Sequence, residues 1–254
     1  LISRRSAFKK TKRLFVIAAE GDATEPMYFA AFQPGRHGTF RLKVLDNPRH
    51  KTSPLKVVER LTDYERVYQP GSDTEYWAVV DRDTWGEEEL AAAWTLIGTK
   101  KGHYHLALSN PCFELWLWLH LFPNRPFADR HDCCRSLARE WSGFRTKSDF
   151  DVAALVTTQH IADACERARR LDTDPSTPWP RGQATRIHQL VERLRQRPGA
   201  AAAHLLMKAL TTLAGRSRLS TTMAMDSLLL LSPRRPARRA QPGRSSPTCR
   251  RAPA

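Results

Sequence analysis

The chain has 254 residues, of which 41% are hydrophobic and 26% are charged, so it is long enough to bury a substantial core. No apolar run approaches the roughly 20 residues that cross a bilayer, so we expect a cytoplasmic protein without a membrane span. The formal net charge of +15 is unevenly spread, because residues 1–13 hold six basic and no acidic side chains, and residues 197–254 hold eleven basic ones against Asp226 alone. Residues 14–196 therefore carry a net charge of −1, and charge-driven binding of nucleic acid is expected at the two ends, unless these are solvated segments without a function.

The first 110 residues alternate β-rich runs with helical patterns, which is typical of a mostly parallel sheet with crossover helices. Residues 14–19 form a continuously apolar run, and Ser53 precedes apolar positions that recur every three to four residues. The expected strands lie at residues 14–19, 40–45, 75–80 and 103–109, and the expected helices at residues 25–32, 53–68 and 87–96.

From Pro111 onward the pattern becomes helical, and after Arg197 it becomes Ala-rich and then rich in Pro, Arg and Ser. The fold class is therefore α/β, with a mostly parallel sheet and flanking helices followed by a helical C-terminal half. The later helices are expected at residues 113–121, 130–141, 149–170 and 185–195. We divide the chain into a basic arm (1–13), an α/β domain (14–125), a helical extension packing on it (126–196) and a basic, disordered tail (197–254).

Two groups of residues that often carry chemistry are assigned to the core. The five cysteines are odd in number and form no C-x-x-C pair, which argues against a disulfide framework and a structural zinc site and favours free thiols. His120, Trp116 and Trp118 lie in an otherwise apolar helix and are expected to be buried packing residues.

Acidic side chains follow two strands of the expected sheet where those strands end. Glu20 and Gly21 follow the first strand, and Asp81 and Asp83 follow the third. Ligands of parallel sheets bind outside the carboxyl ends of the strands, and Gly21 allows a tight turn there. Converging carboxylates repel one another, and a hard divalent cation such as Mg²⁺ relieves that repulsion. Each motif alone is also common as a helix cap, a turn or a surface charge, so the prediction of a metal site rests on their joint placement.

Three stretches of sequence make the prediction of a metal site more specific. They are EGDATEPMYF at residues 20–29, VDRD at residues 80–83 and SNPCFELWL at residues 109–117. The carboxylate arrangement resembles the Toprim domain, the metal-dependent phosphoryl-transfer module of primases, topoisomerases and certain nucleases. Together with residues 174–177 and 187–194, the three stretches resemble the RloB-like family of Toprim-type proteins over residues 13–196.

The resemblance implies a Toprim fold and an Mg²⁺-dependent nuclease, with Mn²⁺ as a substitute ion, that works in bacterial anti-phage defence beside an ATPase encoded nearby. It implies that Glu20 acts as general acid or base or binds metal, and that Asp81 and Asp83 hold Mg²⁺. Glu25 becomes an additional ligand by the same resemblance. The alternative for Glu25 is a favourable charge at a helix N-terminus.

Ser109, Asn110 and Glu114 are expected to line the same cleft as Glu20 and Asp81. Asn110 is placed to cap the helix that follows, whose N-terminal N–H groups would attract phosphate. A carboxylate at position 114 of an apolar helix is costly unless it is paired or directed at metal. The alternative has equal weight. In it, these residues serve only the fold, as a helix cap and as a Glu114 side chain bonded to a nearby arginine such as Arg82.

The sequence thus predicts a metal-dependent endonuclease acting on DNA or on RNA such as tRNA. It contains no G-x-x-x-x-G-K-[ST] phosphate loop, so we expect it not to hydrolyse nucleotides by itself. The rival is a non-enzymatic, Toprim-shaped adaptor that docks a defence ATPase and uses its carboxylates structurally.

Overall fold

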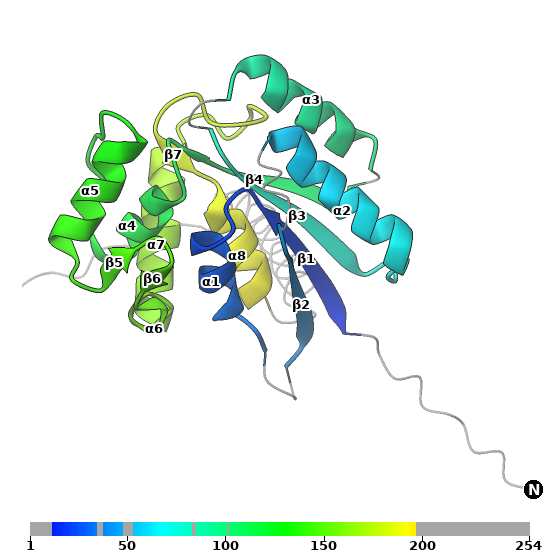
Figure 1. Cartoon of the computed structure of the whole chain (residues 1–254), viewed down its shortest axis with the longest axis horizontal. Coiled ribbons are helices and arrows are strands. Elements are labelled where there is room, and N and C mark those ends of the chain that lie inside the picture. The colour runs from blue at the N-terminus through cyan, green and yellow to red at the C-terminus, as the bar shows by residue number, and fades with distance from the viewer. Residues whose placement is uncertain (1–11, 35–37, 48–52, 83–84, 101, 197–254) are drawn as a thin grey trace, which may run out of the picture. The chain divides into compact units, whose positions relative to one another are not determined.

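The structure is a computed structural model, drawn in Figure 1. It describes residues 12–34, 38–47, 53–82, 85–100 and 102–196. Most of the expected arm, the whole of the expected tail and the predicted ligand Asp83 lie outside the described residues. Among the helices of the described part, none combines the length and apolarity that crossing a membrane requires.

A five-stranded sheet with the order β2-β1-β3-β4-β7 forms the centre of the fold. Its members are β1 (Arg13–Ala19), β2 (Phe40–Leu45), β3 (Thr74–Asp81), β4 (Tyr104–Asn110) and β7 (Ala184–Thr185). The first four strands run parallel, as the alternation of strands and helices predicts, while β7 pairs antiparallel with the end of β4. The mostly parallel α/β fold is therefore confirmed, with one edge strand supplied by the C-terminal half.

Both faces of the sheet are covered by helices, which explains why β1 and β3 are almost entirely buried along their length. The helices α2 (Pro54–Tyr68) and α3 (Glu87–Gly98) pack on the face that carries Val16 and Ala78. The opposite face is covered by α1 (Thr24–Ala30), α4 (Glu114–Leu121), α7 (Thr158–Leu171) and α8 (Ile187–Arg195). Figure 1 shows α2 and α3 on one side of the strands and α1 and α8 on the other. Each fully buried aliphatic or aromatic side chain contributes about 1.5–3 kcal/mol to this packing.

The connections change direction between β1 and β3. From β1 the chain crosses through α1 to β2 on one side, and from β2 it crosses over β1 through α2 to β3 on the other. Loops diverge at such a switch point and leave a crevice at the carboxyl ends of the two strands. Glu20 directly follows β1 and Asp81 ends β3, so the chain order itself brings these two carboxylates to one place.

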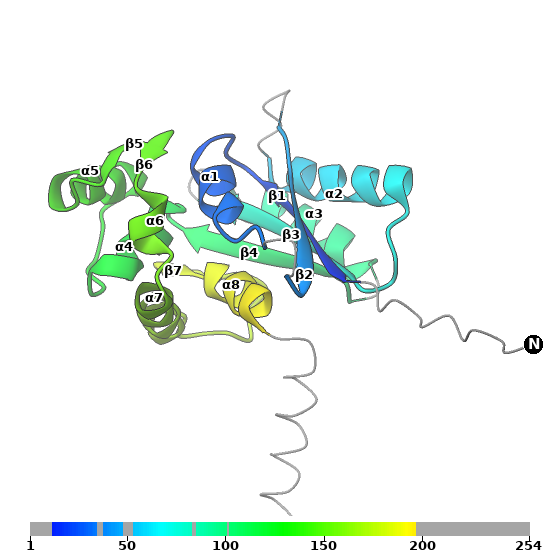
Figure 2. The same cartoon turned by 90° about the horizontal axis from the view of Figure 1, so that it is seen from below.

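The second half differs from the expected run of helices. In addition to α7 and α8 it contains α5 (Arg130–Glu140), the hairpin β5 (Phe144–Thr146) and β6 (Asp149–Phe150), and the short α6 (Val152–Leu155). Figure 2 shows α5, β5, β6 and α6 gathered beside the end of β4.

The single helix expected over residues 149–170 is wrong. Asp151 accepts a hydrogen bond from the Ala154 N–H at 3.1 Å and caps α6, and Thr157 accepts one from the His160 N–H at 3.1 Å and caps α7. Each cap starts a new helix and ends the previous segment.

The residues of α4 that were assigned to packing lie in the core. Trp116 and His120 are 0% and 1% exposed. The His120 Nδ1 lies 2.8 Å from the Trp116 carbonyl, and its Nε2 lies 3.1 Å from the Tyr28 hydroxyl. Burial lowers the pKa of His120 to about 4, so its imidazole is neutral at physiological pH and has both nitrogens satisfied.

Candidate active site

A pocket of about 460 Å³ lies where β1 and β3 end, and we call it the carboxylate pocket. Five acidic and two basic residues line it: Glu20, Asp22, Glu25, Asp81, Glu114, Arg130 and Lys147. Four of the predicted site carboxylates are thereby brought together. Gly21, the fifth predicted member, lies on the same wall.

Glu20 is held in place by the sheet and by one indole ring. Its backbone N–H donates to the Val79 carbonyl at 2.9 Å and extends the ladder between β1 and β3. Its carboxylate accepts the Asp81 N–H at 3.1 Å and the Trp85 indole N–H at 3.1 and 3.2 Å. These donors fix the direction of the carboxylate oxygens.

Glu25 turns back onto the loop from which it starts. It lies in the first turn of α1 with 5% exposure, and its Oε1 accepts the Gly21 N–H at 3.2 Å. A Cβ at position 21 would meet this carboxylate, so a larger residue there would require the Glu25 side chain to move. Burial raises the pKa of Glu25, and the charge of Glu114 raises it further.

The ionisation of Asp81 is opposed both by burial and by neighbouring carboxylates. Burial raises its pKa well above the ordinary range, and the charges of Glu25, Glu114 and Glu20 add to the shift. Its Oδ1 is buried and has no hydrogen-bond partner among the described residues. A buried carboxylate oxygen without a partner is costly, so this atom is available to a ligand.

Glu114 and Lys147 form an ion pair across the pocket. The Lys147 Nζ lies 2.8 Å from the Glu114 Oε1, and the Glu114 side chain is 2% exposed. Burial alone would raise the pKa of Glu114, but the charge and hydrogen bond of Lys147 outweigh it and hold that pKa below the usual range. Lys147 lies on the turn between β5 and β6, and its carbonyl accepts the Thr24 hydroxyl at 2.9 Å. The hairpin therefore closes the pocket against α1.

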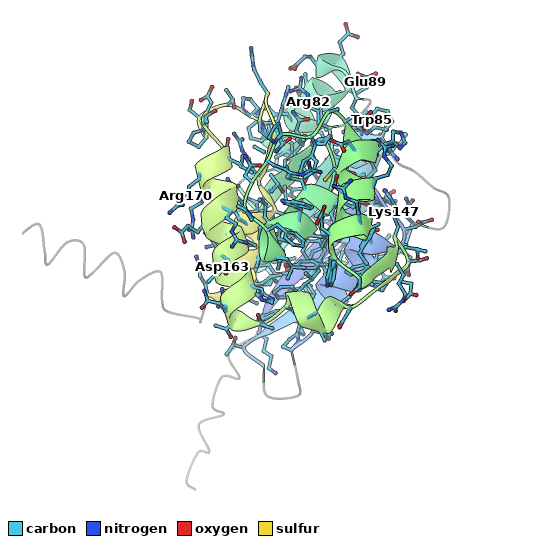
Figure 3. All side chains as sticks on the ribbon, turned by 90° about the vertical axis from the view of Figure 1, so that its left-hand side faces the viewer. Arg82, Trp85, Glu89, Lys147, Asp163 and Arg170 are labelled. Atoms are coloured by element: carbon cyan, nitrogen blue, oxygen red, sulfur yellow. The ribbon has the colours of Figure 1, made fainter. Side chains whose placement is uncertain are left out.

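Lys147 and Trp85 were not predicted from the sequence. Lys147 is one of many basic residues in its region and lies 33 positions after Glu114, so no local spacing marks it. Trp85 follows Asp81 by four positions, and an indole donor so close to a strand end is the only signal that the sequence offered. Figure 3 labels both residues on the same side of the molecule.

Two predicted cleft residues lie elsewhere. The Ser109 hydroxyl is 2.8 Å from the Thr185 hydroxyl, inside the sheet, and the Asn110 amide donates to the Arg181 and Gly182 carbonyls at 3.0 and 2.8 Å. Neither residue lines the carboxylate pocket.

The expected cap and the expected arginine partner are both wrong. The helix α4 begins at Glu114 after Phe113, without a side-chain cap, because the Asn110 amide is engaged with the loop. Arg82 pairs with Glu87 at 2.6 Å rather than with Glu114.

The pocket holds more acid than base, and its oxygen donors are of the kind that hard divalent cations take. The unpartnered Asp81 Oδ1 and the raised pKa values of Asp81 and Glu25 both indicate that a bound cation would lower the energy of this arrangement. The residues present therefore fit a metal ion such as Mg²⁺.

Comparison with known proteins gives a family. Neither the curated proteins nor the solved structures yield a match to the chain. A family model described as RloB-like protein matches residues 15–194, which include most of β1, every element from α1 to β7, most of α8 and all of the pocket residues. The chain therefore belongs to the RloB-like protein family.

Proposed function

We propose that this protein is an Mg²⁺-dependent, Toprim-type nuclease that cleaves nucleic-acid phosphodiester bonds in anti-phage defence. The observation that carries the proposal is the convergence of Glu20, Glu25 and Asp81 in one pocket at the switch point of a parallel sheet. These carboxylates come from two strand ends and one helix start, and burial together with mutual repulsion works against their ionisation at two of the three positions. Carboxyl groups whose ionisation is disfavoured in this way are concentrated at sites of binding and catalysis.

Glu20, Glu25 and Asp81 would hold the ion, while Asp83 lies outside the described residues. When bound, Mg²⁺ would neutralise charge on the phosphoryl group and lower the pKa of a bound water. Mn²⁺ takes the same oxygen ligands and should substitute.

The residues of the chain have separate tasks in this proposal. Trp85 and the Asp81 N–H orient the Glu20 carboxylate, so that it can accept or return a proton or bind metal at a fixed position. Lys147 and Arg130 place positive charge on the pocket wall, where a phosphodiester brings negative charge.

The substrate class follows from charge. The basic residues of segments 1–13 and 197–254 would supply sequence-independent attraction to DNA or to RNA such as tRNA. The sequence holds no nucleotide-hydrolysing phosphate loop, so any ATP-driven step would need a partner ATPase.

The test is a cleavage assay with the full chain on duplex DNA, single-stranded DNA and tRNA, with and without Mg²⁺ and with any ATPase encoded beside its gene. We expect Glu20→Gln and Asp81→Asn each to lower Mg²⁺-dependent cleavage about 100-fold or more while leaving the circular dichroism spectrum unchanged. Glu166→Gln, an exposed position on α7, is the matched control and should cleave normally.

Calorimetric titration with Mg²⁺ separates loss of the ion from loss of chemistry in the same variants. Full cleavage by both site variants would contradict the proposal. Phage resistance that persists in both variants, without any cleavage, would favour the rival role as an adaptor of an ATPase.

A further inference from the structure

A second group of donor atoms shares Glu114 with the carboxylate pocket but differs from that pocket in chemistry. Cys112, Glu114 and Cys134 each offer one ligand atom, and these atoms all lie within 4.8 Å of one another. Two of the three donors are sulfur, which hard ions such as Mg²⁺ do not select. The group therefore needs an explanation separate from that of the carboxylate pocket.

The fold brings together residues that sequence spacing keeps apart. Cys112 lies just before α4, Glu114 is the first residue of α4, and Cys134 lies on α5, which packs against α4. Successive residues of a helix point about 100° apart. Accordingly Cys133 is fully buried at 0% exposure in the main core, while its neighbour Cys134 is half-buried and belongs to the donor group.

Glu114 supplies the observation that points to a ligand. Its Oε1 pairs with Lys147, and its Oε2 is buried without a hydrogen-bond partner of ordinary geometry among the described residues. The side chain is only 2% exposed, and the nearby Cys112 thiol contributes to lowering its pKa. An unpartnered carboxylate oxygen in such a site costs free energy that a bound cation would recover.

We propose that Cys112, Cys134 and the Glu114 Oε2 bind a thiophilic divalent cation of the Zn²⁺ class. A tetrahedral ion with bonds of about 2.0–2.3 Å separates its donors by about 3.5–3.8 Å, so no pair of donors needs to approach by more than about 1 Å. Three protein ligands leave the fourth position for water.

The charges and protons of this site balance. Both thiols have raised pKa values, Cys112 through its hydrogen bond with Cys133 and through burial, and Cys134 through its hydrogen bond with Cys112 and through burial. Without metal they are therefore protonated, and binding of one M²⁺ forms two metal–sulfur bonds and releases two protons. Two thiolates and one carboxylate exceed the ion by one negative charge, which Lys147 beside Glu114 neutralises.

The probe is Co²⁺, because cobalt bound by thiolates absorbs strongly in the near ultraviolet and Zn²⁺ displaces it. The reduced, metal-free full chain should take up one Co²⁺ with this absorption and lose it on addition of one equivalent of Zn²⁺. We expect Cys112→Ser, Cys134→Ser and Glu114→Gln each to weaken Zn²⁺ binding at least about tenfold. Because Cys112 is buried, the half-buried Cys134 decides the outcome if Cys112→Ser does not fold.

Two matched variants keep the assignment specific. Cys165→Ser and Cys249→Ser remove thiols outside the donor group and should leave the cobalt spectrum unchanged. Absence of the charge-transfer absorption, its survival in Cys134→Ser, or its loss in Cys165→Ser or Cys249→Ser would overturn the site.

The proposal can be tested separately from the proposed nuclease function, because Glu20 lies outside the donor group although Glu114 belongs to both sites. Glu20→Gln should abolish Mg²⁺-dependent cleavage but keep the cobalt spectrum. Cleavage without a cobalt site, or a cobalt site without cleavage, therefore rejects one of the two proposals and leaves the other standing.

Discussion

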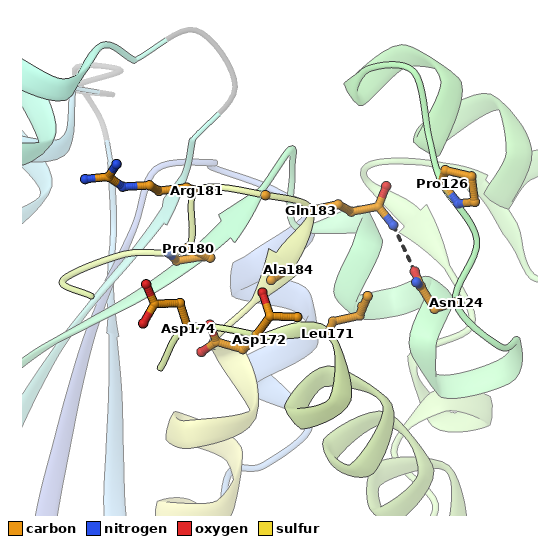
Figure 4. A pocket seen from close by; sticks show the side chains of 11 residues that line it. Asn124, Pro126, Leu171, Asp172, Asp174, Pro180, Arg181, Gln183 and Ala184 are labelled. Carbon is orange, nitrogen blue, oxygen red and sulfur yellow. Dashed lines mark hydrogen bonds between the residues drawn. The ribbon is translucent and has the colours of Figure 1, made fainter. Parts of the chain in front are cut away.

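Two pockets of similar size treat their acidic residues in opposite ways. The carboxylate pocket measures about 460 Å³, and a second one of about 410 Å³ lies beneath the loop over residues 172–184, which we call the loop pocket. Figure 4 shows the loop pocket with Asp172 and Asp174 on its floor and a 2.8 Å hydrogen bond between Gln183 and Asn124 at its side.

In the loop pocket the buried acid is fully partnered. Arg186 donates to both oxygens of Asp172, at 2.7 and 3.1 Å, and also to the carbonyls of Thr177 and Asp174. The side chains of Arg186 and Asp172 are only 6% and 5% exposed. Such a bidentate pair fixes the loop and gives each carboxylate oxygen a charged partner.

In the carboxylate pocket, by contrast, five acids share the wall with Arg130 and Lys147. The Asp81 Oδ1 and the Glu114 Oε2 have no hydrogen-bond partner in the described part of the chain. Volume alone therefore does not distinguish the two pockets. The two pockets differ in whether their carboxylates have hydrogen-bond and ion-pair partners. A paired carboxylate stabilises the fold, whereas a surplus of carboxylates favours a bound cation.

The largest expected effect comes from removing the ion-pair partner of Asp172 in the loop pocket. Arg186→Met leaves Asp172 buried without its counter-ion and should lower the free energy of unfolding by about 3–5 kcal/mol. Urea unfolding followed by circular dichroism measures this change. Arg169→Met, which removes an exposed ion pair with Glu192, is the matched control and should cost at most about 1 kcal/mol. Equal losses in the two variants would show that the buried pair is not special.

A smaller effect is expected where an indole N–H orients Glu20. Trp85→Phe keeps an aromatic ring but removes the donor, so Mg²⁺ affinity should fall about tenfold while the fold stays intact. Calorimetric titration with Mg²⁺ measures this loss. Trp179→Phe removes an indole donor to Glu87 at 3.2 Å and should not change Mg²⁺ affinity. Unchanged affinity in Trp85→Phe would show that this hydrogen bond does not position Glu20 for metal.

The smallest effect is a gain in stability. Because the pKa of Asp81 is raised in the folded state, its ionisation destabilises the metal-free protein, and stability is lost as the pH rises through that raised pKa. Asp81→Asn should therefore raise the melting temperature at pH 7 by about 2–4 °C, corresponding to about 1 kcal/mol.

The gain should disappear at acidic pH, where Asp81 is protonated, and should shrink when excess Mg²⁺ stabilises the unmodified protein. Differential scanning calorimetry at both pH values measures it. The same exchange at the paired acid, Asp172→Asn, should lower the melting temperature instead. A loss of stability in Asp81→Asn at pH 7 would mean that its charge is already compensated without metal.

The first half of the fold was readable from local patterns. Ser53 caps α2 by accepting the Lys56 N–H at 3.4 Å, and the apolar runs of β1 and β3 match strands that are buried on both faces. Each of these elements can be predicted from residues that lie close together in the sequence. Glu20 and Asp81 could be placed together because the carboxyl ends of parallel strands share one edge.

The remainder depends on contacts between distant residues. The strand β7 has only two residues, too few for a periodic pattern, yet it pairs with Ser109 and Asn110 and draws both away from the expected cleft. Lys147 reaches the pocket only through the β5–β6 hairpin, and Cys112 meets Cys134 only through the packing of α4 on α5. No local spacing encodes such meetings, so sequence reasoning missed them.

The hairpin turn that carries Lys147 has a consequence for biosynthesis. Thr24 and Lys147 contact each other although 123 positions separate them. At about 5–20 residues per second, a ribosome needs about 6–25 s to travel that distance. During this interval Glu20, and later Asp81, are present on the nascent chain before the Lys147 ammonium group has been added. The pocket is therefore completed only after all four parallel strands have been synthesised.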